Sequence, residues 1–389
     1  MKKQLNGIFL LAGTAIGSGM ISLPIVLSHI GALPTLFLLL FVATTTYFSA
    51  LVRTELNLRS DSSFTLEDVG KKFSGPISAL IGNICFKALH FSLLSAYICG
   101  LGSMIFTNDG FATIIVGVCS FLALAFSSKR IASFNGTLFV VLSAIVLGAI
   151  VCMLIGVNLK NLPLIASAPR ISRICVILPT VFTSFGFQGS LHSLTKLCDN
   201  DRKMIKTACF WGSLIPAVVY ILWTFGVTAV VFNSQPELFA KMVAEGVEVG
   251  ELISALGFAS NVVAVKYATF AISALAIATS ILGVGIALVE DMEMAFDRLN
   301  VAVNKEIKRI VAALIAATPA TFIAIVVPEA FIKTLSFAGM ILAAMALFLP
   351  AFLFFKIKKP TGIKNGVVYG LIVFGLLIVG CEVASLIMG

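Results

Sequence analysis

The stretch LAGTAIGSGMISLP, residues 11–24, decides the fold, because it interrupts the first long apolar run of the chain. Glycines, hydroxyl side chains and a proline stand in the middle of a segment that is otherwise suited to a membrane-spanning helix. Unwinding a helix inside a bilayer frees backbone N–H and C=O groups, and each costs several kcal/mol if it stays unpaired. A bound ligand can pair those groups, so the interruption indicates a binding site.

The composition is that of an integral membrane protein. The 389 residues are 59% hydrophobic and 12% charged, whereas a soluble domain is about 45–50% apolar and about 25% charged. The loops are short, so we expect a single all-α transmembrane domain over residues 1–389, embedded in a lipid bilayer, with no soluble domain attached. Apolar runs of about 20 residues predict eleven spans, at 5–30, 33–56, 77–106, 110–127, 131–157, 172–196, 205–232, 264–290, 308–327, 329–355 and 365–388.

The net charge of +9 indicates a membrane topology and not nucleic-acid binding. If Lys2 and Lys3 are cytoplasmic, the inner loops and helix ends hold 20 of the 27 Lys and Arg residues, six lie outside, and Lys87 lies in a span. This is the bias that the positive-inside rule requires. We therefore expect the N-terminus in the cytoplasm and, after eleven spans, the C-terminus outside. A signal peptide cleaved after Gly19 is the alternative, but it would remove the span that this charge count requires.

Catalysis and metal binding find no support in the residue pattern. The eight cysteines show no CxxC or His-paired spacing, so neither a metal site nor a disulfide framework is expected. Asp, His and Cys residues do not cluster along the chain, and we expect neither an enzyme nor a cofactor.

A second interruption of the same kind, PTVFTSFGFQGSLH at residues 179–192, lies in the sixth predicted span. Gly19 in the first and Gly189 in the second stand 170 residues apart. Five spans make up this interval, and an odd number of spans reverses orientation, so the repeat must be inverted in the membrane. The expected units are a five-helix repeat at 5–157, its inverted copy at 172–355 and an extra C-terminal helix at 365–388. Paired interrupted helices point to a transporter substrate site at the bilayer midplane.

The chemistry of the two interruptions fits a zwitterion, and therefore an amino acid. The half-helix after the first interruption presents N–H groups and the positive end of its dipole, which suit a carboxylate. The expected amides are those of Gly17, Ser18 and Gly19. The half-helices that end at the interruptions present carbonyls, which suit an ammonium group or Na⁺. The expected carbonyls are those of Thr14, Ala15, Phe182 and Thr183.

Two other interpretations of the glycines compete with a binding site. Gly13 and Gly17 form a GxxxG pattern, which in a lone instance indicates close helix packing. A phosphate-binding loop is disfavoured, because no Lys-Ser/Thr pair follows and the stretch is embedded in membrane-spanning sequence. The recurrence of the interruption 170 residues later favours the binding site.

At these residues the chain resembles the hydroxy/aromatic amino acid permease family, within the amino acid-polyamine-cation superfamily, and in particular its tyrosine- and tryptophan-specific bacterial branch. The similar stretches follow in family order: GTAIGSGMISLP (13–24), SAYICGLGS (95–103), FTSFGFQGSL (182–191), GSLIPAVVYILW (212–223) and ATSILGVGIAL (278–288). The resemblance implies the LeuT-like fold of five-plus-five inverted repeats with an eleventh helix. It also implies cation-driven amino acid uptake across the bacterial inner or plasma membrane.

Two positions depart from the aromatic branch. Gln188 stands where a histidine is usual, and His192 where a proline is usual. Both lie in or just after the second interruption, so serine, threonine or another neutral amino acid stays open as the substrate.

The resemblance places the side-chain pocket between the third, sixth and eighth spans. The expected residues are Ser95 and Tyr97 in the third, Phe185, Gly186, Phe187 and Gln188 in the sixth, and Thr279 and Ser280 in the eighth. Phe185 and Phe187 are expected to stack on an aromatic substrate, with ordinary packing as the alternative, because the chain holds 32 phenylalanines. Trp211, Tyr220 and Trp223 are interpreted as interfacial anchors or as bundle packing.

Two routes of ion coupling remain open, because no buried carboxylate relay is expected in the ten core helices. In the first, Na⁺ is held by carbonyls at the first interruption, including that of Ala15, and by the hydroxyls of Thr279 and Ser280, since hard oxygen ligands suit a hard cation. In the second, Lys87 or His90 in the third span titrates. Snorkelling toward the cytoplasm is the alternative for Lys87.

The sequence therefore predicts a symporter that imports an aromatic amino acid by alternating access, tyrosine first and tryptophan next, with H⁺ or Na⁺ as the coupling ion. A channel or a sensor on the same scaffold is a remote alternative, because the spans carry too few polar residues to line a continuous pore. Residues 234–260 are expected to form an external amphipathic segment, either a lid over the site or simple surface cover. The oligomeric state stays open.

Overall fold

The computed structural model describes residues 2–17, 19–60, 65–105, 110–126, 128–156, 162–166, 171–258, 263–300, 303–327, 330–357 and 363–388. Ser18, one of the expected carboxylate ligands, lies outside these residues. Within them all regular secondary structure is helical, as predicted.

The helices follow the predicted spans closely. Those of the first half are α1 (Lys2–Ala15), α2 (Gly19–Leu27), α3 (Ala32–Arg59), α4 (Leu66–Ser74), α5 (Pro76–Ile105), α6 (Gly110–Ala125) and α7 (Ser128–Gly156). Those of the second half are α8 (Ile171–Ser184), η2 (Phe187–Ser190), α9 (Leu191–Leu197), α10 (Arg202–Ser234), α11 (Pro236–Ala244), α12 (Val249–Phe258), α13 (Val263–Arg298), α14 (Lys305–Val326), α15 (Ala330–Ala343), η3 (Ala344–Phe348), α16 (Leu349–Phe355) and α17 (Asn365–Met388). In the described chain, eight helices are long and apolar enough to cross a membrane, or nine if α1 and α2 form one span, and α6 and Thr137–Met153 of α7 are shorter apolar helices.

The first span is broken where the sequence predicts it. α1 ends at Ala15, α2 begins at Gly19, and the two half-helices are bent by 54°. Pro24 lies inside α2 and has no N–H to give to the carbonyl of Met20, one turn earlier. The indole Nε1 of Trp223 on α10 donates to that carbonyl instead, at 2.7 Å. The break is thus fixed from α10.

The sixth span is broken as well. α8 ends at Ser184, and the chain turns through Phe185 and Gly186 into the single 3₁₀ turn η2 before α9 begins. The amide of Gly186 donates to the carbonyl of Thr183 at 2.9 Å, and the amide of Phe187 donates to that of Phe185 at 2.8 Å. These short-range bonds replace the α-helical ladder over the turn.

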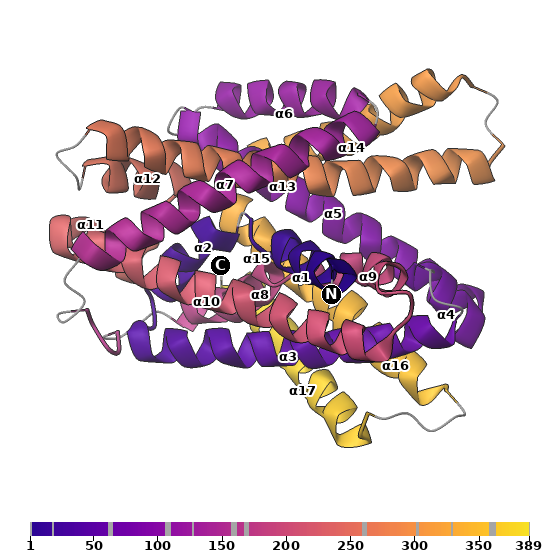
Figure 1. The fold of residues 1–389 in the computed structure, drawn as a ribbon. Coiled ribbons are helices and arrows are strands. Elements are labelled where there is room, and N and C mark those ends of the chain that lie inside the picture. Colours follow the sequence, from indigo (N-terminus) through magenta and orange to yellow (C-terminus); the bar gives the residue numbers. More distant parts are fainter. Residues whose placement is uncertain are drawn as a thin grey trace.

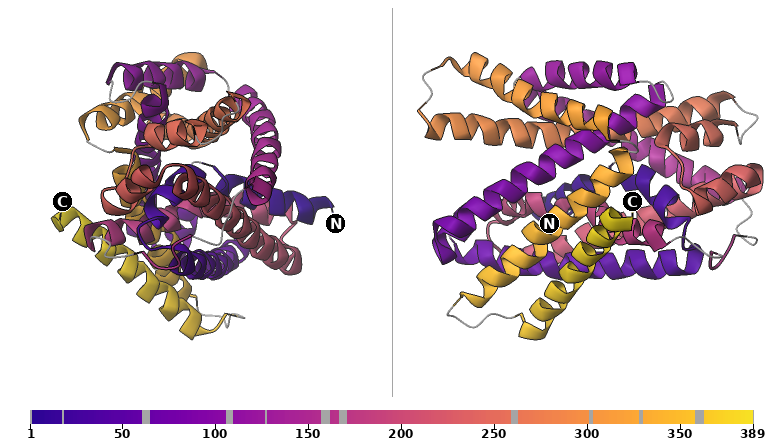
Figure 2. Two further views of the ribbon diagram at one scale, coloured as in Figure 1. Left: turned by 90° about the vertical axis from the view of Figure 1, so that its left-hand side faces the viewer. Right: turned by 180° about the vertical axis from the view of Figure 1, so that it is seen from behind.

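Helices that are distant in the sequence pack in two groups. The first consists of α1, α2, α3, α8, α9 and α10, and the second of α5, α6, α13 and α14. In Figure 1, α6, α13 and α14 lie along the top, and α3 and α10 lie below them. α15 packs against both α5 and α8 and so joins the two groups. α17 packs on α8 and α15, and Figure 2 shows it at the outer edge of the molecule.

The tenth predicted span contains a π-helical turn, η3, between α15 and α16. Pro350 has no N–H for the carbonyl of Ala346, and the hydroxyl of Ser49 on α3 donates to that carbonyl at 2.7 Å. A wide turn of this kind accommodates one more residue than a regular helix does. It is held in place by a side chain from the first group.

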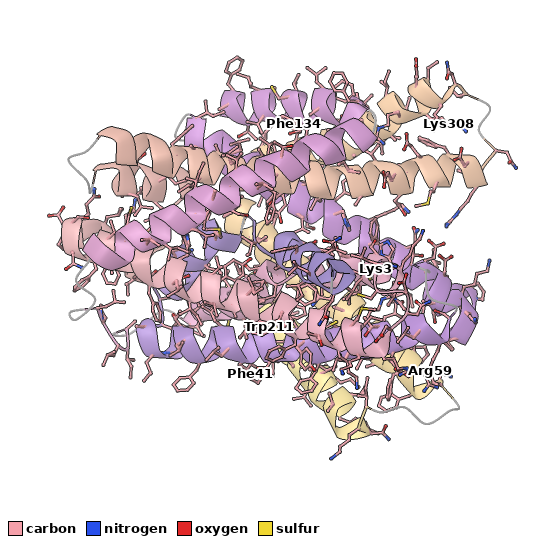
Figure 3. The ribbon with its side chains drawn as sticks, viewed as in Figure 1. Lys3, Phe41, Arg59, Phe134, Trp211 and Lys308 are labelled. Atoms are coloured by element: carbon pink, nitrogen blue, oxygen red, sulfur yellow. The ribbon has the colours of Figure 1, made fainter. Side chains whose placement is uncertain are left out.

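Large apolar side chains cover the outside of the helices, as contact with lipid requires. Phe41, Phe134 and Trp211 are 54%, 60% and 44% exposed, and Figure 3 shows them on the outer surface. Arg59 and Lys308 lie toward one end of the molecule in the same view. A soluble protein rarely exposes contiguous apolar surface of this extent, so the outer belt is that of an integral membrane protein.

Candidate functional site at the two helix breaks

The two breaks meet at the hydroxyl of Tyr220, which α10 holds in the interior. Tyr220 Oη lies 2.6 Å from the carbonyl oxygen of Ala15 and 2.8 Å from that of Ser184. These residues end α1 and α8, where carbonyls have no partner within their own helix. The Tyr220 side chain is fully buried. A hydroxyl has one proton to donate, so Tyr220 satisfies one of the two carbonyls at a time.

Gly17 and Gly19 allow the first break to approach its neighbours closely. A Cβ added to Gly17 would lie 2.7 Å from Ser280 Oγ, and one added to Gly19 would lie 2.7 Å from Ser184 Cβ and 2.9 Å from Tyr220 Oη. Real Cβ atoms essentially never come within 3.0 Å of another atom. Neither glycine amide has a hydrogen-bond acceptor among the described residues. Two of the three amides expected for a carboxylate are therefore open to a ligand.

A second link joins the breaks through side chains. The accessible hydroxyl of Thr14 lies 3.1 Å from Ser190 Oγ in η2. Gln188 in the same turn is buried, and neither atom of its amide has a partner among the described residues. His192 uses its Nδ1 on the carbonyl of Gly189 at 2.8 Å. The two positions that depart from the aromatic branch thus differ in their hydrogen bonding. The buried amide of Gln188 has no partner among the described residues, whereas His192 contacts a backbone carbonyl.

The predicted carbonyls of the second break already accept short-range bonds. The carbonyl of Phe182 receives the amide of Phe185 at 3.1 Å, and that of Thr183 receives the amide of Gly186 at 2.9 Å. Each carbonyl retains a second lone pair. The hydroxyl of Thr183 lies 3.0 Å from the carbonyl of Leu335 and so connects the end of α8 to α15.

The two phenylalanines of the second break pack in different places. Phe185 packs edge-on against the ring of Tyr220, with 5.2 Å between the ring centroids, whereas Phe187 is buried in a different apolar cluster with α1 and α9. Tyr97 of α5 lies near enough to Tyr220 to interact electrostatically. Ser95, also on α5, is fully buried. The structure therefore packs Phe185 on Tyr220 at the meeting point of the breaks, whereas Phe187 packs on the other side, in the cluster that contains Ala15.

Of the two hydroxyls expected to bind Na⁺, Ser280 is the one that the structure brings to the first break, beside Gly17. Ser280 and Thr279 also donate to the carbonyl of Ala276 within α13, at 2.9 and 3.0 Å. The described residues contain no group of three His, Cys, Asp or Glu side chains that could hold a metal ion. A sodium site formed by backbone and hydroxyl oxygens stays a prediction.

Lys87 belongs to a polar network that joins α4, α5 and α13. Its Nζ lies 2.8 Å from a carboxylate oxygen of Asp291 and also donates to Asn83. Asn83 donates to Glu67 at 3.0 Å, and Arg298 donates to the same carboxylate at 2.7 Å. The predicted eighth span ends at residue 290, but α13 continues to Arg298 because these contacts stabilise its charged last turns. Lys87 is thus paired with Asp291, and its side chain is 28% exposed.

His90 lies one turn further along α5. Its Nδ1 lies 2.7 Å from the carbonyl of Phe86, and its ring packs on the Phe86 ring with centroids 3.9 Å apart. Asp291, which interacts electrostatically with His90, follows Ser280 by eleven residues on α13, or roughly 16 Å at 1.5 Å per residue. The structure therefore places the two titratable candidates well away from the helix breaks.

The expected external segment forms α11 and α12 and contacts the end of α2 through His29. His29 Nδ1 lies 2.8 Å from the carbonyl of Val243 in α11. Burial is the main cause that lowers the pKa of His29, and the nearby cation of Arg173 lowers it further. A Cβ on Gly246 would lie 3.2 Å from an Arg173 nitrogen and 3.9 Å from His29 Nε2. The segment is thus attached to the half-helix that follows the first break.

Two buried polar residues on α3 have unused hydrogen-bonding groups. Arg53 is 6% exposed and Asn57 is fully buried. One guanidinium nitrogen of Arg53 and both amide atoms of Asn57 have no partner among the described residues. The Arg53 charge interacts at longer range with Asp68 and His192. This is a charged group inside the protein without a direct counter-ion in the described chain.

Tyr220, Trp223 and Ser184 are the site residues that sequence reasoning misses. Trp211 is exposed, but Tyr220 and Trp223 are buried at the breaks, so interfacial anchoring is wrong for these two and bundle packing is right. Their spacing of three places them on one face of α10. An aromatic pair with polar tips in an otherwise apolar helix is the signal that could have pointed to them.

The sequence is similar to those of known amino acid transporters. A family model described as the tryptophan/tyrosine permease family matches residues 1–388. The tyrosine-specific transport system 1 of Haemophilus influenzae is 30% identical over 370 residues, 92% of this chain and 89% of that protein. The low affinity tryptophan permease of Escherichia coli (strain K12) is 26% identical, over 96% of this chain and 94% of that protein. Glutamine transporter 2 of Aliivibrio fischeri is 24% identical, over 92% and 90%.

Solved structures show the same fold at low identity. MhsT in complex with L-phenylalanine superposes with a TM-score of 0.58 and 14% identity, over 98% of both chains. A mutant of the Eremococcus coleocola manganese transporter gives a TM-score of 0.58 and 13% identity, over 97% of this chain and 85% of that one. The all-helical LeuT-like fold is thus confirmed, while the division into two five-helix repeats and an eleventh helix stays a prediction.

Proposed function

Because this chain belongs to the tryptophan/tyrosine permease family, we propose that it is a symporter that imports an aromatic amino acid, tyrosine first and tryptophan second. It is an integral membrane transporter of the bacterial inner membrane and not an enzyme. The observation that carries the proposal is the meeting of two broken helices at Tyr220, with open amides on one side and terminal carbonyls on the other.

The proposed pose of the substrate follows the polarity of the breaks. The carboxylate binds the amides at residues 17–19, where the start of α2 adds the positive end of a helix dipole. The ammonium group binds the carbonyls that end α1 and α8, those of Thr14, Ala15, Phe182, Thr183 and Ser184. The aromatic ring lies toward Phe185 and Tyr97, and the packing of Phe185 on the Tyr220 ring supports this placement. Ser95 and Gln188 complete the proposed pocket.

Alternating access on an inverted repeat is part of the proposal. Each group of packed helices draws the same numbered spans from the two halves of the chain. Spans one and two join spans six and seven, and spans three and four join spans eight and nine. This pairing supports two repeats over 5–157 and 172–355, with 365–388 as the added helix. Movement of one group against the other would open the site to either side of the membrane in turn.

Coupling to a cation is proposed along two routes. Na⁺ bound by the carbonyl of Ala15 and the hydroxyls of Thr279 and Ser280 is the first, and the contact of Ser280 with Gly17 supports it. Protonation at His90, with Lys87 as its neighbour on α5, is the second. The ion pair of Lys87 with Asp291 makes Lys87 the weaker carrier, because its charge is already compensated.

A neutral amino acid such as glutamine, serine or threonine is the second candidate substrate. One relative, which matches this chain over 90% of its own length, is named as a glutamine transporter. Gln188 supports this candidate, because its buried and unpartnered amide can pair with a polar side chain.

A cytoplasmic N-terminus and an external C-terminus are proposed from the distribution of charge. Lys and Arg residues gather at the end of the molecule formed by α4, α9 and the α13–α14 connection, opposite the end that carries α11 and α12. The residues at this end include Arg59, Lys71, Lys72, Lys196, Arg202, Arg298 and Lys308. The positive-inside rule assigns this end to the cytoplasm.

Uptake by purified protein in proteoliposomes tests the proposal. Labelled tyrosine, tryptophan and glutamine are offered under a proton gradient alone and then under a sodium gradient alone. Accumulation of tyrosine or tryptophan supports the aromatic assignment, and the effective gradient identifies the ion. Accumulation of glutamine alone would make glutamine the substrate in place of an aromatic amino acid. Counterflow without concentrative uptake would show that transport is not coupled to an ion gradient. In a counterflow assay, a channel would not accumulate labelled substrate in vesicles that are preloaded with unlabelled substrate.

A further inference from the structure

The Tyr220 hydroxyl occupies the position that an ammonium group would take between the two breaks. We infer that it is a placeholder, which pairs with the carbonyls of Ala15 and Ser184 in the empty site and releases them when an amino acid binds. The inference rests on the proposed function and assigns Tyr220 as a positioning residue for the substrate amine.

The distances to Tyr220 Oη support a shared position. At 2.6 and 2.8 Å, the carbonyl oxygens of Ala15 and Ser184 surround the hydroxyl as they would surround a hydrogen-bonded nitrogen. Among the described hydrogen bonds, Tyr220 is the sole donor to either carbonyl. Its one proton cannot satisfy two acceptors, whereas an ammonium group has three protons. Exchange of the hydroxyl for an ammonium group therefore completes the hydrogen bonding of both half-helices.

The surroundings of the Tyr220 hydroxyl are closely packed. Tyr220 is fully buried, Phe185 covers one edge of its ring, and a Cβ on Gly19 would lie only 2.9 Å from the hydroxyl. A substrate amine that binds both carbonyls is therefore expected to displace the hydroxyl. Trp223 on the same face of α10 donates to the carbonyl of Met20, so α10 contacts both sides of the first break.

The sign of one substitution distinguishes a placeholder from a direct ligand. Tyr220→Phe removes the competitor for the carbonyls, so the affinity for an amino acid should increase. The loss of one hydrogen bond that the substrate must break corresponds to about a fivefold lower Kd. Turnover should fall, because release then leaves both carbonyls without a donor. Removal of a direct ligand would instead raise Kd.

The experiment compares two probes on each purified full-length protein. The probes are L-tyrosine and 3-(4-hydroxyphenyl)propanoate, which keeps the ring and the carboxylate but lacks the amine. The ratio of their Kd values cancels changes in affinity that do not depend on the amine. In Tyr220→Phe the ratio should shift about fivefold toward L-tyrosine. The control is Trp211→Phe, an aromatic exchange at an exposed position of the same helix, which should leave the ratio unchanged. An unchanged ratio in Tyr220→Phe, or an equal shift in the control, overturns the inference.

A second measurement covers the case in which Tyr220→Phe does not fold. 3-Fluorotyrosine placed at position 220 of the intact protein reports its surroundings by ¹⁹F NMR. Its resonance should move when L-tyrosine is added and stay in place with the deaminated probe. A resonance that ignores both ligands overturns the inference. A resonance that moves equally with both probes also overturns it, because the movement would then not depend on the amine.

The two proposals fail in different ways. If the wild-type protein binds neither tyrosine nor any other amino acid, the proposed function is wrong. If the wild type binds tyrosine but the ratio does not shift in Tyr220→Phe, only the placeholder role is wrong.

Discussion

At the residue scale, Gly19 and Gly189 stand at matching places in the two breaks but in different surroundings. A Cβ on Gly19 would lie 2.7 Å from Ser184 Cβ, whereas a Cβ on Gly189 would meet no atom within 4 Å. The close approach of the breaks therefore depends on one glycine of the pair. The two positions provide a matched comparison.

Gly19→Ala is expected to lower uptake about tenfold or more, because overpacking of 1–3 kcal/mol is enough to separate the breaks. Gly189→Ala is the control and should retain uptake within about twofold, since its new methyl group enters open space. Both are measured as labelled uptake normalised to the amount of protein in the membrane. Equal losses of uptake in the two variants would show that the glycines are needed for a reason other than the close approach of Gly19 to Ser184.

Arg53→Met is expected to raise the thermal midpoint of the purified protein by a few degrees. A buried charge without a direct partner is costly, and apolar replacement of buried ionic groups is often stabilising by about 1–4 kcal/mol. The control is Arg59→Met, which loses an ion pair with Glu55 at 2.6 Å and should not stabilise. Loss of uptake in Arg53→Met at an unchanged midpoint would mean that Arg53 binds an anion during transport.

At the element scale, the breaks and their neighbours differ in how far the sequence predicts them. Glycines, hydroxyls and prolines act on the backbone nearby, so the ends of α1 and α8 follow from local sequence. The role of Tyr220 does not, because Tyr220 on α10 contacts Ala15 from 205 residues away in the sequence. The extension of α13 past residue 290 is likewise missed, since hydropathy ends there while ion pairs such as that of Asp291 continue the helix.

The docking of α11 on His29 is expected to weaken below neutral pH. Burial and Arg173 lower the pKa of His29 from its ordinary value of 6.5, so the undocked form takes up a proton first. Docking is therefore complete above pH 6.5 and weakens as the pH falls toward the lowered value. Hydrogen exchange of residues 236–258, corrected for its intrinsic pH dependence, should be faster at pH 5.5 than at pH 7.5, a range of about two units around the ordinary pKa.

His29→Gln is the matched control for this pH dependence. Glutamine keeps an N–H donor for the carbonyl of Val243 but does not titrate. The ratio of exchange rates should then be independent of pH. A persistent pH effect in His29→Gln would show that His29 is not the group responsible.

At the scale of the whole molecule, two groups of helices meet around the breaks, and the coupling ion has to act at their junction. Gly17 belongs to the first group and Ser280 to the second. The sequence predicts both positions but not their contact, because a period of hydrophobicity contains no information about which helices face each other. The resemblance to permeases supplies that pairing, and the structure places Ser280 accordingly.

Thr279→Ala combined with Ser280→Ala is expected to abolish the sodium stimulation of uptake, because two of the proposed oxygen ligands disappear. Tyrosine uptake is measured against sodium concentration and against pH in the same proteoliposomes. His90→Ala is the comparison and should leave the sodium response intact. An unaltered sodium response in the double variant, together with a flattened pH profile in His90→Ala, would assign coupling to protons.

The π-helical turn η3 makes the length of the tenth span more constrained than its composition. Residues 344–348 are small or apolar and pack without polar side-chain contacts of their own, so exchanges among such residues are readily accommodated. Deletion of one residue would restore regular helix and turn α16 by about 100°. Leu349 and Leu353 would then leave their cluster with Leu56 and Val69. In homologous chains that keep this packing, the residue types at these five positions should vary, but the length of the segment should not.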